Sequence, residues 1–252
     1  MSNVHKIGNY VCASIDFLGT KEKIQQEWFL QNVAELLSGL KKMDNPESSA
    51  YVRVFSDNFV LAAEVTDSFD HAVSSVIQMS TDMQWKALAM TNCLVRGGIT
   101  YGQLLVSADV VIGIALSRAY EIETKEAIYP RIVVDEAIID KLTNSREPDP
   151  CFKHIALDHL CRDFDGRQYV KQYDDFTRGD NSHAVNLEHP HHDSYIKKLN
   201  KYEAVFNEMV ENARKKCDYS VLQKYVWWAK YMNKKFEYHD IPCRLCVPPL
   251  YS

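Results

Sequence analysis

The stretch Tyr51–Val65, YVRVFSDNFVLAAEV, constrains the fold more than any other part of this chain. Two runs of apolar, aromatic and β-branched residues flank Ser56-Asp57-Asn58, and these three residue types favour turns. The pattern predicts a β-hairpin that carries the Asp57 carboxylate at its tip. A carboxylate at such a tip is ordinary, so its meaning depends on the segments around the hairpin.

Those neighbouring segments alternate between strand and helix patterns. Asn9–Thr20 has the composition of a buried strand that ends at Asp16, and Leu94–Val106 is a second such strand. Apolar residues recur at helical spacing in Lys21–Met43 and in Asp67–Met90. The order is therefore β-α-β-β-α-β, the split βαβ arrangement. It predicts an α+β, ferredoxin-like core, in which an antiparallel sheet carries helices on one face.

This strand order brings Asp16 and Asp57 together. Right-handed crossovers place the third strand beside the first and antiparallel to it, so the hairpin turn lies next to the C-terminal end of the first strand. Two carboxylates on adjacent strand ends repel each other unless a cation lies between them. The sequence therefore predicts a metal site here. Taken singly, Asp16 also fits a helix N-cap, and Asp57 fits an ordinary turn residue.

Composition argues against several classes of protein. The formal net charge of −5 and the pI of about 6.0 do not suit a nucleic-acid binder, which needs a concentrated basic face. No apolar run is long enough to predict a membrane span, and the N-terminus lacks a signal-peptide pattern. The seven cysteines are an odd number, and Cys12 and Cys93 lie in apolar strands. Reduced thiols and a cytoplasmic location are therefore expected.

The rest of the chain is expected to elaborate this core. Ser107–Glu123 is most simply a helix opened by a glycine, and Phe164–Tyr173 is a second hairpin with an Asp-Gly turn. Thr177–His192 is polar and contains four histidines, which indicates a surface loop. Two amphipathic helices then precede an extended tail. We expect a core over residues 1–140 and an elaboration over residues 141–252, the second hairpin and the two helices, packed on it as one compact unit.

Three motifs together resemble class III nucleotidyl cyclase domains: IDFLGT (15–20), SDNF (56–59), and VRGGITYGQLL with VVIGIALSRAYEIE (95–105 and 110–123). In that family a strand ending in Asp precedes a glycine-containing phosphate loop, and a hairpin tip carries a second Asp. A strand of the form R-x-G-I-x-x-G then leads into a glycine-started helix. The resemblance covers about residues 9–135. VRGGITYG and the C-terminal WWAKYMN are also similar to the pyrimidine cyclases of bacterial Pycsar anti-phage systems.

The resemblance implies a two-metal active site with a ferredoxin-like cyclase fold. Asp16 and Asp57 would bind two divalent metals, Mg²⁺ or Mn²⁺, on a nucleoside triphosphate, and the Phe17 carbonyl would be a further ligand. One metal would activate the ribose 3′-hydroxyl, and the other would hold the leaving pyrophosphate. The phosphates would be cradled by the next three backbone amides, those of Leu18, Gly19 and Thr20. The family acts as a head-to-tail homodimer with its sites at the subunit interface.

The resemblance also suggests which base is read. Purine cyclases place a lysine that reads the base four residues before the hairpin aspartate, and here that position is Arg53. Strand alternation puts Tyr51 on the same face. A guanidinium donates to O4 of uracil more naturally than to the N4 amine of cytosine, and a tyrosine narrows the pocket. A uridylate cyclase making 3′,5′-cyclic UMP for an antiviral effector protein is favoured, with a cytidylate or purine cyclase as the alternative.

Three matched positions depart from the family pattern. The second base-reading position falls near Val110, the transition-state asparagine matches Ser117, and the transition-state arginine matches Glu121. A carboxylate cannot stabilise developing negative charge, so the neighbouring Arg118 is the expected replacement, with Ser117 beside it. Without such a cation the domain would be an inactive cyclase-homology module for sensing or dimerisation. Arg96 is expected to form a structural ion pair.

Overall fold

The computed structural model describes residues 6–21, 23–41, 50–66, 68–107, 110–144, 149–172, 189–247 and 249. The chain divides into two compact units, residues 1–173 and 174–252. The residues after 140 are thus shared between the two units, and a separately folding core of residues 1–140 stays a prediction. Most of the histidine-containing segment, residues 177–188, lies outside the described residues.

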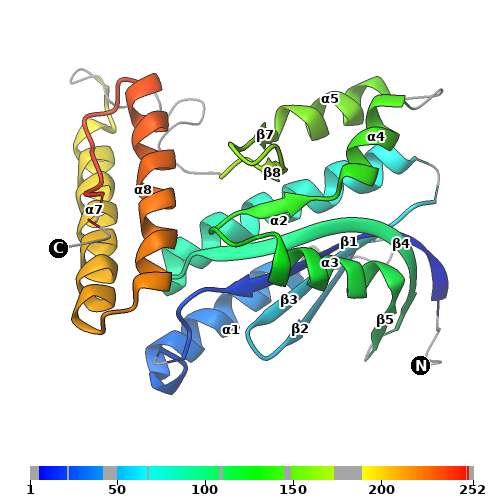
Figure 1. The fold of residues 1–252 in the computed structure, drawn as a ribbon, viewed down its shortest axis with the longest axis horizontal. Coiled ribbons are helices and arrows are strands. Elements are labelled where there is room, and N and C mark those ends of the chain that lie inside the picture. Colours follow the sequence, from blue (N-terminus) through cyan, green and yellow to red (C-terminus); the bar gives the residue numbers. More distant parts are fainter. Residues whose placement is uncertain are drawn as a thin grey trace. The chain divides into compact units, whose positions relative to one another are not determined.

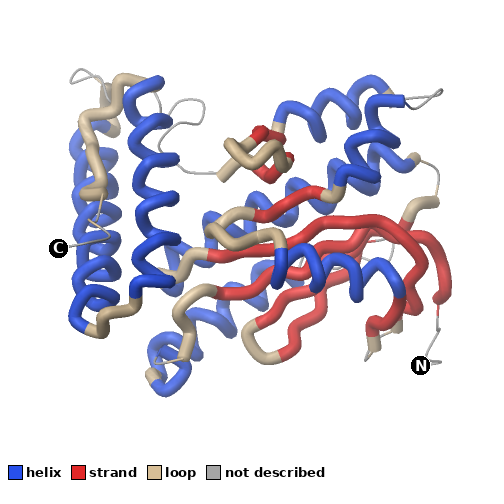
Figure 2. The backbone as a smooth tube through the Cα atoms, in the orientation of Figure 1, coloured by secondary structure: helices blue, strands red, loops and turns tan. Residues whose placement is uncertain are grey.

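The first unit is a mixed sheet that carries helices (Figures 1 and 2). Its strands are β1 (Lys6–Phe17), β2 (Ala50–Phe55), β3 (Asn58–Glu64), β4 (Val95–Val106), β5 (Val111–Gly113), β6 (Ile132–Val134), β7 (Leu160–Arg162) and β8 (Gln168–Val170). Its helices are η1 (Lys23–Gln25), α1 (Glu27–Lys41), α2 (Phe69–Thr91), α3 (Ile114–Lys125), α4 (Glu136–Asn144) and α5 (Pro150–Asp158).

The strand order is β2-β3-β1-β4-β6-β8-β7, with β5 paired to β4. β1 pairs antiparallel with both β3 and β4, and β6 adds to β4 in parallel. The order β2-β3-β1-β4 is that of a ferredoxin-like βαββαβ core, so the predicted α+β fold class is confirmed. A second hairpin is also present, as β7 and β8, but its first strand, β7, lies before the predicted range Phe164–Tyr173.

Two elements differ from the sequence prediction. The segment Ser107–Glu123 is not helical throughout, because β5 precedes α3. The β-branched run Val110-Val111-Ile112 favours a strand, and the helix begins only after Gly113, whose φ of +151° suits glycine. Helix α5 was not predicted; Asp149 caps its N-terminus by accepting a hydrogen bond from the Cys151 amide.

Side chains on β1 alternate between two sheet faces. Val11, Ala13 and Ile15 contribute to the large core that also contains residues of α1, α2, α4 and α5. Tyr10 and Cys12 face the other way and cluster with residues of β5 and α3. The predicted helical layer therefore covers one face of the sheet, and α3 lies against the opposite face.

Helix α3 approaches β4 closely because glycine leaves room for it. A Cβ atom at Gly98 would lie 2.4 Å from the Ala119 carbonyl oxygen and 2.6 Å from Ile122 Cβ. A Cβ atom at Gly113 would lie 2.3 Å from the Gln103 carbonyl oxygen. The glycines of the R-x-G-I strand and of the helix start are thus explained by packing.

The second unit contains α7 (His192–Lys215) and α8 (Tyr219–Tyr238), which pack against each other. Trp228 Nε1 donates a hydrogen bond to the Tyr202 hydroxyl at 2.9 Å. The Asn233 side chain binds the Leu245 backbone twice and so attaches the tail to α8. None of the helices in the described ranges is long and apolar enough to cross a membrane.

Helix α2 carries a buried amide that makes no hydrogen bond. Gln84 is 4% exposed, and neither its Oε1 nor its Nε2 has a hydrogen-bond partner among the described residues. Such an unpaired group costs about 1–3 kcal/mol. We therefore expect Gln84→Met, which keeps the volume, to raise the free energy of unfolding by about 1–2 kcal/mol in urea denaturation. Gln223→Met, at an exposed position of α8, is the control; a Gln84→Met protein no more stable than the original would contradict the prediction.

Candidate active site

The structure brings the two predicted aspartates to one end of the sheet. Asp16 lies near the end of β1, in register with Asn58 of β3 and Arg96 of β4. Asp57 lies in the β2–β3 turn, where its backbone carbonyl accepts a hydrogen bond from the Phe17 amide at 3.4 Å. The hairpin tip therefore meets the end of β1, as the strand order predicts.

Several charges act on Asp16. Burial raises the pKa of its carboxyl to about 6, the Arg96 guanidinium lowers it, and Glu123 and Asp57 raise it by repulsion. Arg96 Nε donates to Asp16 Oδ2 at 3.2 Å, so the expected ion pair of Arg96 is present. Among the described residues, Arg96 is the one cation that acts on Asp16, and two further carboxylates, Glu123 and Asp57, act on it as well. Negative charge is therefore in excess around Asp16.

Glu123 of α3 is the residue that sequence reasoning missed. It is 2% exposed, and its Oε2 accepts hydrogen bonds from Ser14 Oγ at 2.6 Å and Asn58 Nδ2 at 2.8 Å. Its Oε1 lies 3.8 Å from Arg96 Nη2. A signal existed in the sequence, because Glu123 lies four residues after Ala119 and so shares the buried face of the helix. A carboxylate there needs partners, since a lone buried charge is costly.

The donor atoms at this end of the sheet fit a hard divalent cation. Asp16 and Asp57 supply carboxylate oxygens, and Thr20 Oγ1 orients Asp57 by donating to its Oδ2 at 2.9 Å. No group of three or more His, Cys, Asp or Glu that could hold a metal ion is found among the described residues. A pair of carboxylates with open positions suits Mg²⁺ or Mn²⁺, because Mg²⁺ in particular keeps waters and substrate phosphates among its ligands.

The predicted phosphate loop follows β1 directly. The Leu18 amide donates to the Leu94 carbonyl at 2.8 Å, so in this arrangement it is occupied. Gly19 is exposed and has a φ of +80°, a left-handed conformation that glycine adopts without strain. Thr20 is buried beside Asp57. A phosphate-binding role for the Gly19 and Thr20 amides stays a prediction.

The predicted base-reading residues lie on the Asp16 face of the sheet. Their register on β2 and β3 places Tyr51 and Arg53 on that face, and the guanidinium lies 5.9 Å from the Tyr51 ring. Arg53 Nε and Nη2 donate to the Ser107 carbonyl at 3.3 and 2.9 Å. Arg53 would therefore have to exchange this carbonyl for a base, and the base-reading role stays a prediction.

Ser117 and Arg118 lie in the first half of α3, whereas Glu123 lies near the end of that helix. Ser117 Oγ donates to the Gly113 carbonyl at 3.3 Å. Arg118 pairs with three carboxylates of its own chain, those of Asp135 at 3.2 Å, Glu121 at 3.1 Å and Glu126 at 3.0 Å. Within the part of the chain that is described, no bond joins either residue to Asp16 or Asp57. Their catalytic role stays a prediction.

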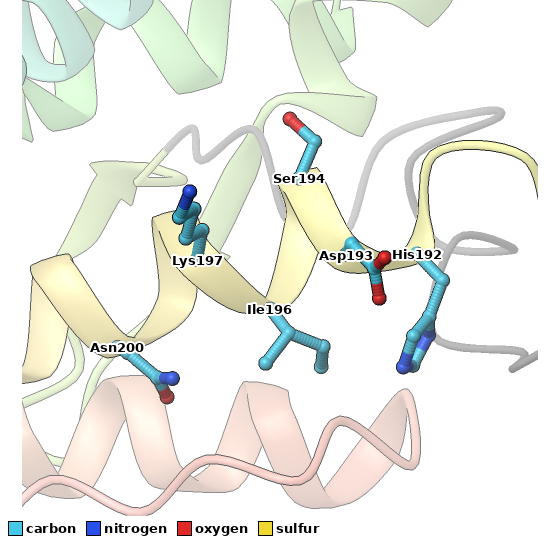
Figure 3. Close-up of a pocket in the computed structure, with 6 residues that line it drawn as sticks. All are labelled: His192, Asp193, Ser194, Ile196, Lys197 and Asn200. Carbon is cyan, nitrogen blue, oxygen red and sulfur yellow. The ribbon is translucent and has the colours of Figure 1, made fainter.

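A separate hollow of about 610 Å³ lies along the first turns of α7 in the second unit (Figure 3). His192, Ile196 and Asn200 point to one side of the helix there, and Ser194 points to the other (Figure 3). The side chains that line the hollow are His192, Asp193, Ser194, Ile196, Lys197 and Asn200. None of these is a predicted site residue.

Solved structures that resemble this chain include nucleotide cyclases. The adenylyl cyclase CyaB from P. aeruginosa matches with a TM-score of 0.49 and 14% identity, over 70% of this chain and 100% of that one. The monomeric guanylyl cyclase domain of the RhoGC fusion protein from the aquatic fungus Blastocladiella emersonii matches with a TM-score of 0.45 and 12% identity, over 67% of this chain and 96% of that one. The guanylate cyclase domain of RhGC from Catenaria anguillulae, in complex with GTP, matches with a TM-score of 0.46 and 10% identity, over 67% and 100%.

Other comparisons gave no match. No family model matches the sequence, and no curated protein matches it. Identities and TM-scores as low as those of the solved structures do not assign the chain to a family.

Proposed function

We propose that this protein is a nucleotide cyclase that converts a pyrimidine nucleoside triphosphate, with UTP favoured, into a 3′,5′-cyclic nucleotide and pyrophosphate. The observation that carries the proposal is the pair Asp16 and Asp57 on adjacent strand ends, followed by the Gly19-Thr20 loop. Their oxygen atoms and the excess of negative charge suit divalent cations. The motif resemblance to class III cyclases supplies the reaction.

The residues at and around the end of β1 would have distinct roles in this reaction. Asp16, Asp57 and the Phe17 carbonyl would hold Mg²⁺ or Mn²⁺. Bound metal would supply Lewis-acid stabilisation of the 3′-oxygen and of the leaving pyrophosphate. Thr20 Oγ1 holds the Asp57 carboxylate in one orientation. The Gly19 and Thr20 amides, which follow β1, would donate to phosphate oxygens.

We place the complete site between two copies of the chain arranged head to tail. Large apolar side chains are exposed on β1, β5 and α3, namely those of Ile7, Ile112, Ile114 and Tyr120. An apolar surface of this kind indicates a partner. The second copy would supply Ser117 and Arg118, and Arg118 would exchange one of its carboxylates for the substrate.

The motif resemblance also supports a biological role. A cyclic pyrimidine nucleotide would act as a second messenger in the cytoplasm and would activate a separate effector protein in anti-phage defence. CTP or a purine triphosphate is the alternative substrate. An inactive sensor or dimerisation module is the second candidate function. It is favoured by Glu121 at the matched arginine position and by the three carboxylates that already neutralise Arg118.

The direct test is to incubate the protein separately with ATP, GTP, CTP and UTP in the presence of Mn²⁺ and to identify products by mass spectrometry. We expect cyclic UMP from UTP in larger amount than any product of the other three. Cyclic CMP or a cyclic purine nucleotide as the main product would correct the base assignment. No product from any of the four would favour the inactive module.

A further inference from the structure

Arg96 lies between two carboxylates on the α3 face of the sheet. Its Nε is 3.2 Å from Asp16 Oδ2, and its Nη2 is 3.8 Å from Glu123 Oε1. The Arg96 and Asp16 side chains are 23% and 21% exposed, whereas the Glu123 side chain is 2% exposed. The guanidinium therefore has one partner that solvent reaches and one that is buried.

The two carboxylates are held differently. Glu123 is fixed by the Ser14 hydroxyl at 2.6 Å and by the Asn58 amide at 2.8 Å. Among the described residues, Arg96 is the one hydrogen-bond donor to the Asp16 carboxylate. If Arg96 leaves Asp16, the Asp16 carboxylate loses this one bond and is then open to another partner. The Glu123 carboxylate, in contrast, stays in place through its bonds to Ser14 and Asn58.

The contact of Arg96 with Glu123 is incomplete. A charge-assisted N–H···O bond is about 2.7–2.9 Å long, so the 3.8 Å separation leaves roughly 1 Å for it to shorten. A guanidinium that lost Asp16 would be left partly buried and unpaired unless this second contact closed, and an unpaired buried charge is costly.

We propose that Arg96 is the resident counterion of the cation site, and that Glu123 receives it when a divalent cation takes Asp16. The inference rests on the proposed function, because it takes Asp16 as a ligand of that cation. Glu123 is a positioning residue that acts through Arg96. Without it, the guanidinium stays on Asp16 and opposes the cation by competition and by charge.

Mn²⁺ titration of the full chain by calorimetry, at one pH and salt concentration, tests this. We expect Glu123→Gln to weaken Mn²⁺ binding at least about tenfold. Arg96→Met should bind Mn²⁺ as tightly as the original chain or more tightly, because the competitor is gone. In the Arg96→Met background, Glu123→Gln should then change the affinity less than about twofold. Arg96→Gln is the second neutral variant if Arg96→Met does not fold by circular dichroism.

Two further variants separate this role from general effects. Ser14→Ala removes a bond that fixes Glu123 and leaves every charge in place, so it should weaken Mn²⁺ binding by about threefold. Glu136→Gln, at an exposed position of α4, removes the same charge elsewhere and should leave the affinity unchanged.

Two results of the variant comparison would overturn the inference. Arg96→Met could weaken Mn²⁺ binding as much as Glu123→Gln does, which would make Arg96 a support of Asp16. Alternatively, Glu123→Gln could weaken Mn²⁺ binding equally in the original chain and in the Arg96→Met variant. The Glu123 charge would then act on the cation directly and not through Arg96. The expected Mn²⁺ pattern without product from any nucleotide would contradict only the proposed function. No Mn²⁺ binding by the original chain would overturn both.

Discussion

Replacing Asp57 by asparagine is expected to lower the rate of cyclic-nucleotide formation by at least about a thousandfold and to leave the fold intact. The substitution removes one of two carboxylates that would hold the divalent cations. Asparagine favours turns as aspartate does, and the hydrogen bond from the Phe17 amide uses the backbone carbonyl of residue 57. The turn and the pairing of β2 with β3 should therefore persist.

The measurement is the initial rate with UTP and Mn²⁺, with product identified by mass spectrometry. Asp140→Asn, an equivalent change at an exposed position of α4, should keep the full rate. Thermal unfolding of both variants checks that the fold is retained. Full activity of Asp57→Asn, or of the harsher Asp57→Ala, would remove this carboxylate from the reaction and the proposed function with it.

The second large effect concerns folding. Gly98→Ala is expected to lower the free energy of unfolding by about 3 kcal/mol. The new Cβ atom would lie 2.4 Å from the Ala119 carbonyl oxygen, and a backbone atom cannot move away by changing a rotamer. Helix α3 would have to shift away from β4. Since α3 carries Glu123, we also expect the Ser14 and Asn58 bonds to be disturbed.

Urea denaturation measures this effect, and Gly39→Ala is the matched control. Gly39 lies inside α1, and a Cβ atom there would have no atom within 4 Å apart from the backbone of its own helical turns. Because alanine favours the helix more than glycine, Gly39→Ala should raise the free energy of unfolding by about 0.5–1 kcal/mol. The two changes are chemically identical and should have opposite signs. A Gly98→Ala protein of unchanged stability would mean that α3 does not pack against β4 at this position.

The positions that the sequence predicted well are those that depend on local patterns. The alternation of Tyr51–Val65 and the helical spacing of Asp67–Met90 sufficed to predict the elements of the core. The right-handed crossover rule then brought Asp16 and Asp57 to one end of the sheet. β5 and α5 were missed, because a short apolar run beside a helix, and a short helix after a polar loop, leave weak periodic signals.

By itself, then, the sequence determined the α+β strand order and the proximity of the two aspartates. The periodicity of the apolar residues specifies the strands and helices, and the right-handed crossover rule specifies how the strands are ordered. Only the tertiary structure decided which partners the charged groups have. Glu123 reaches Arg96 because glycine at position 98 lets α3 approach β4. Arg118, on the same helix, instead pairs with Asp135 and its neighbours. The physical reason is that ion pairs form across distant segments, and their geometry depends on helix-to-sheet packing that no local pattern encodes.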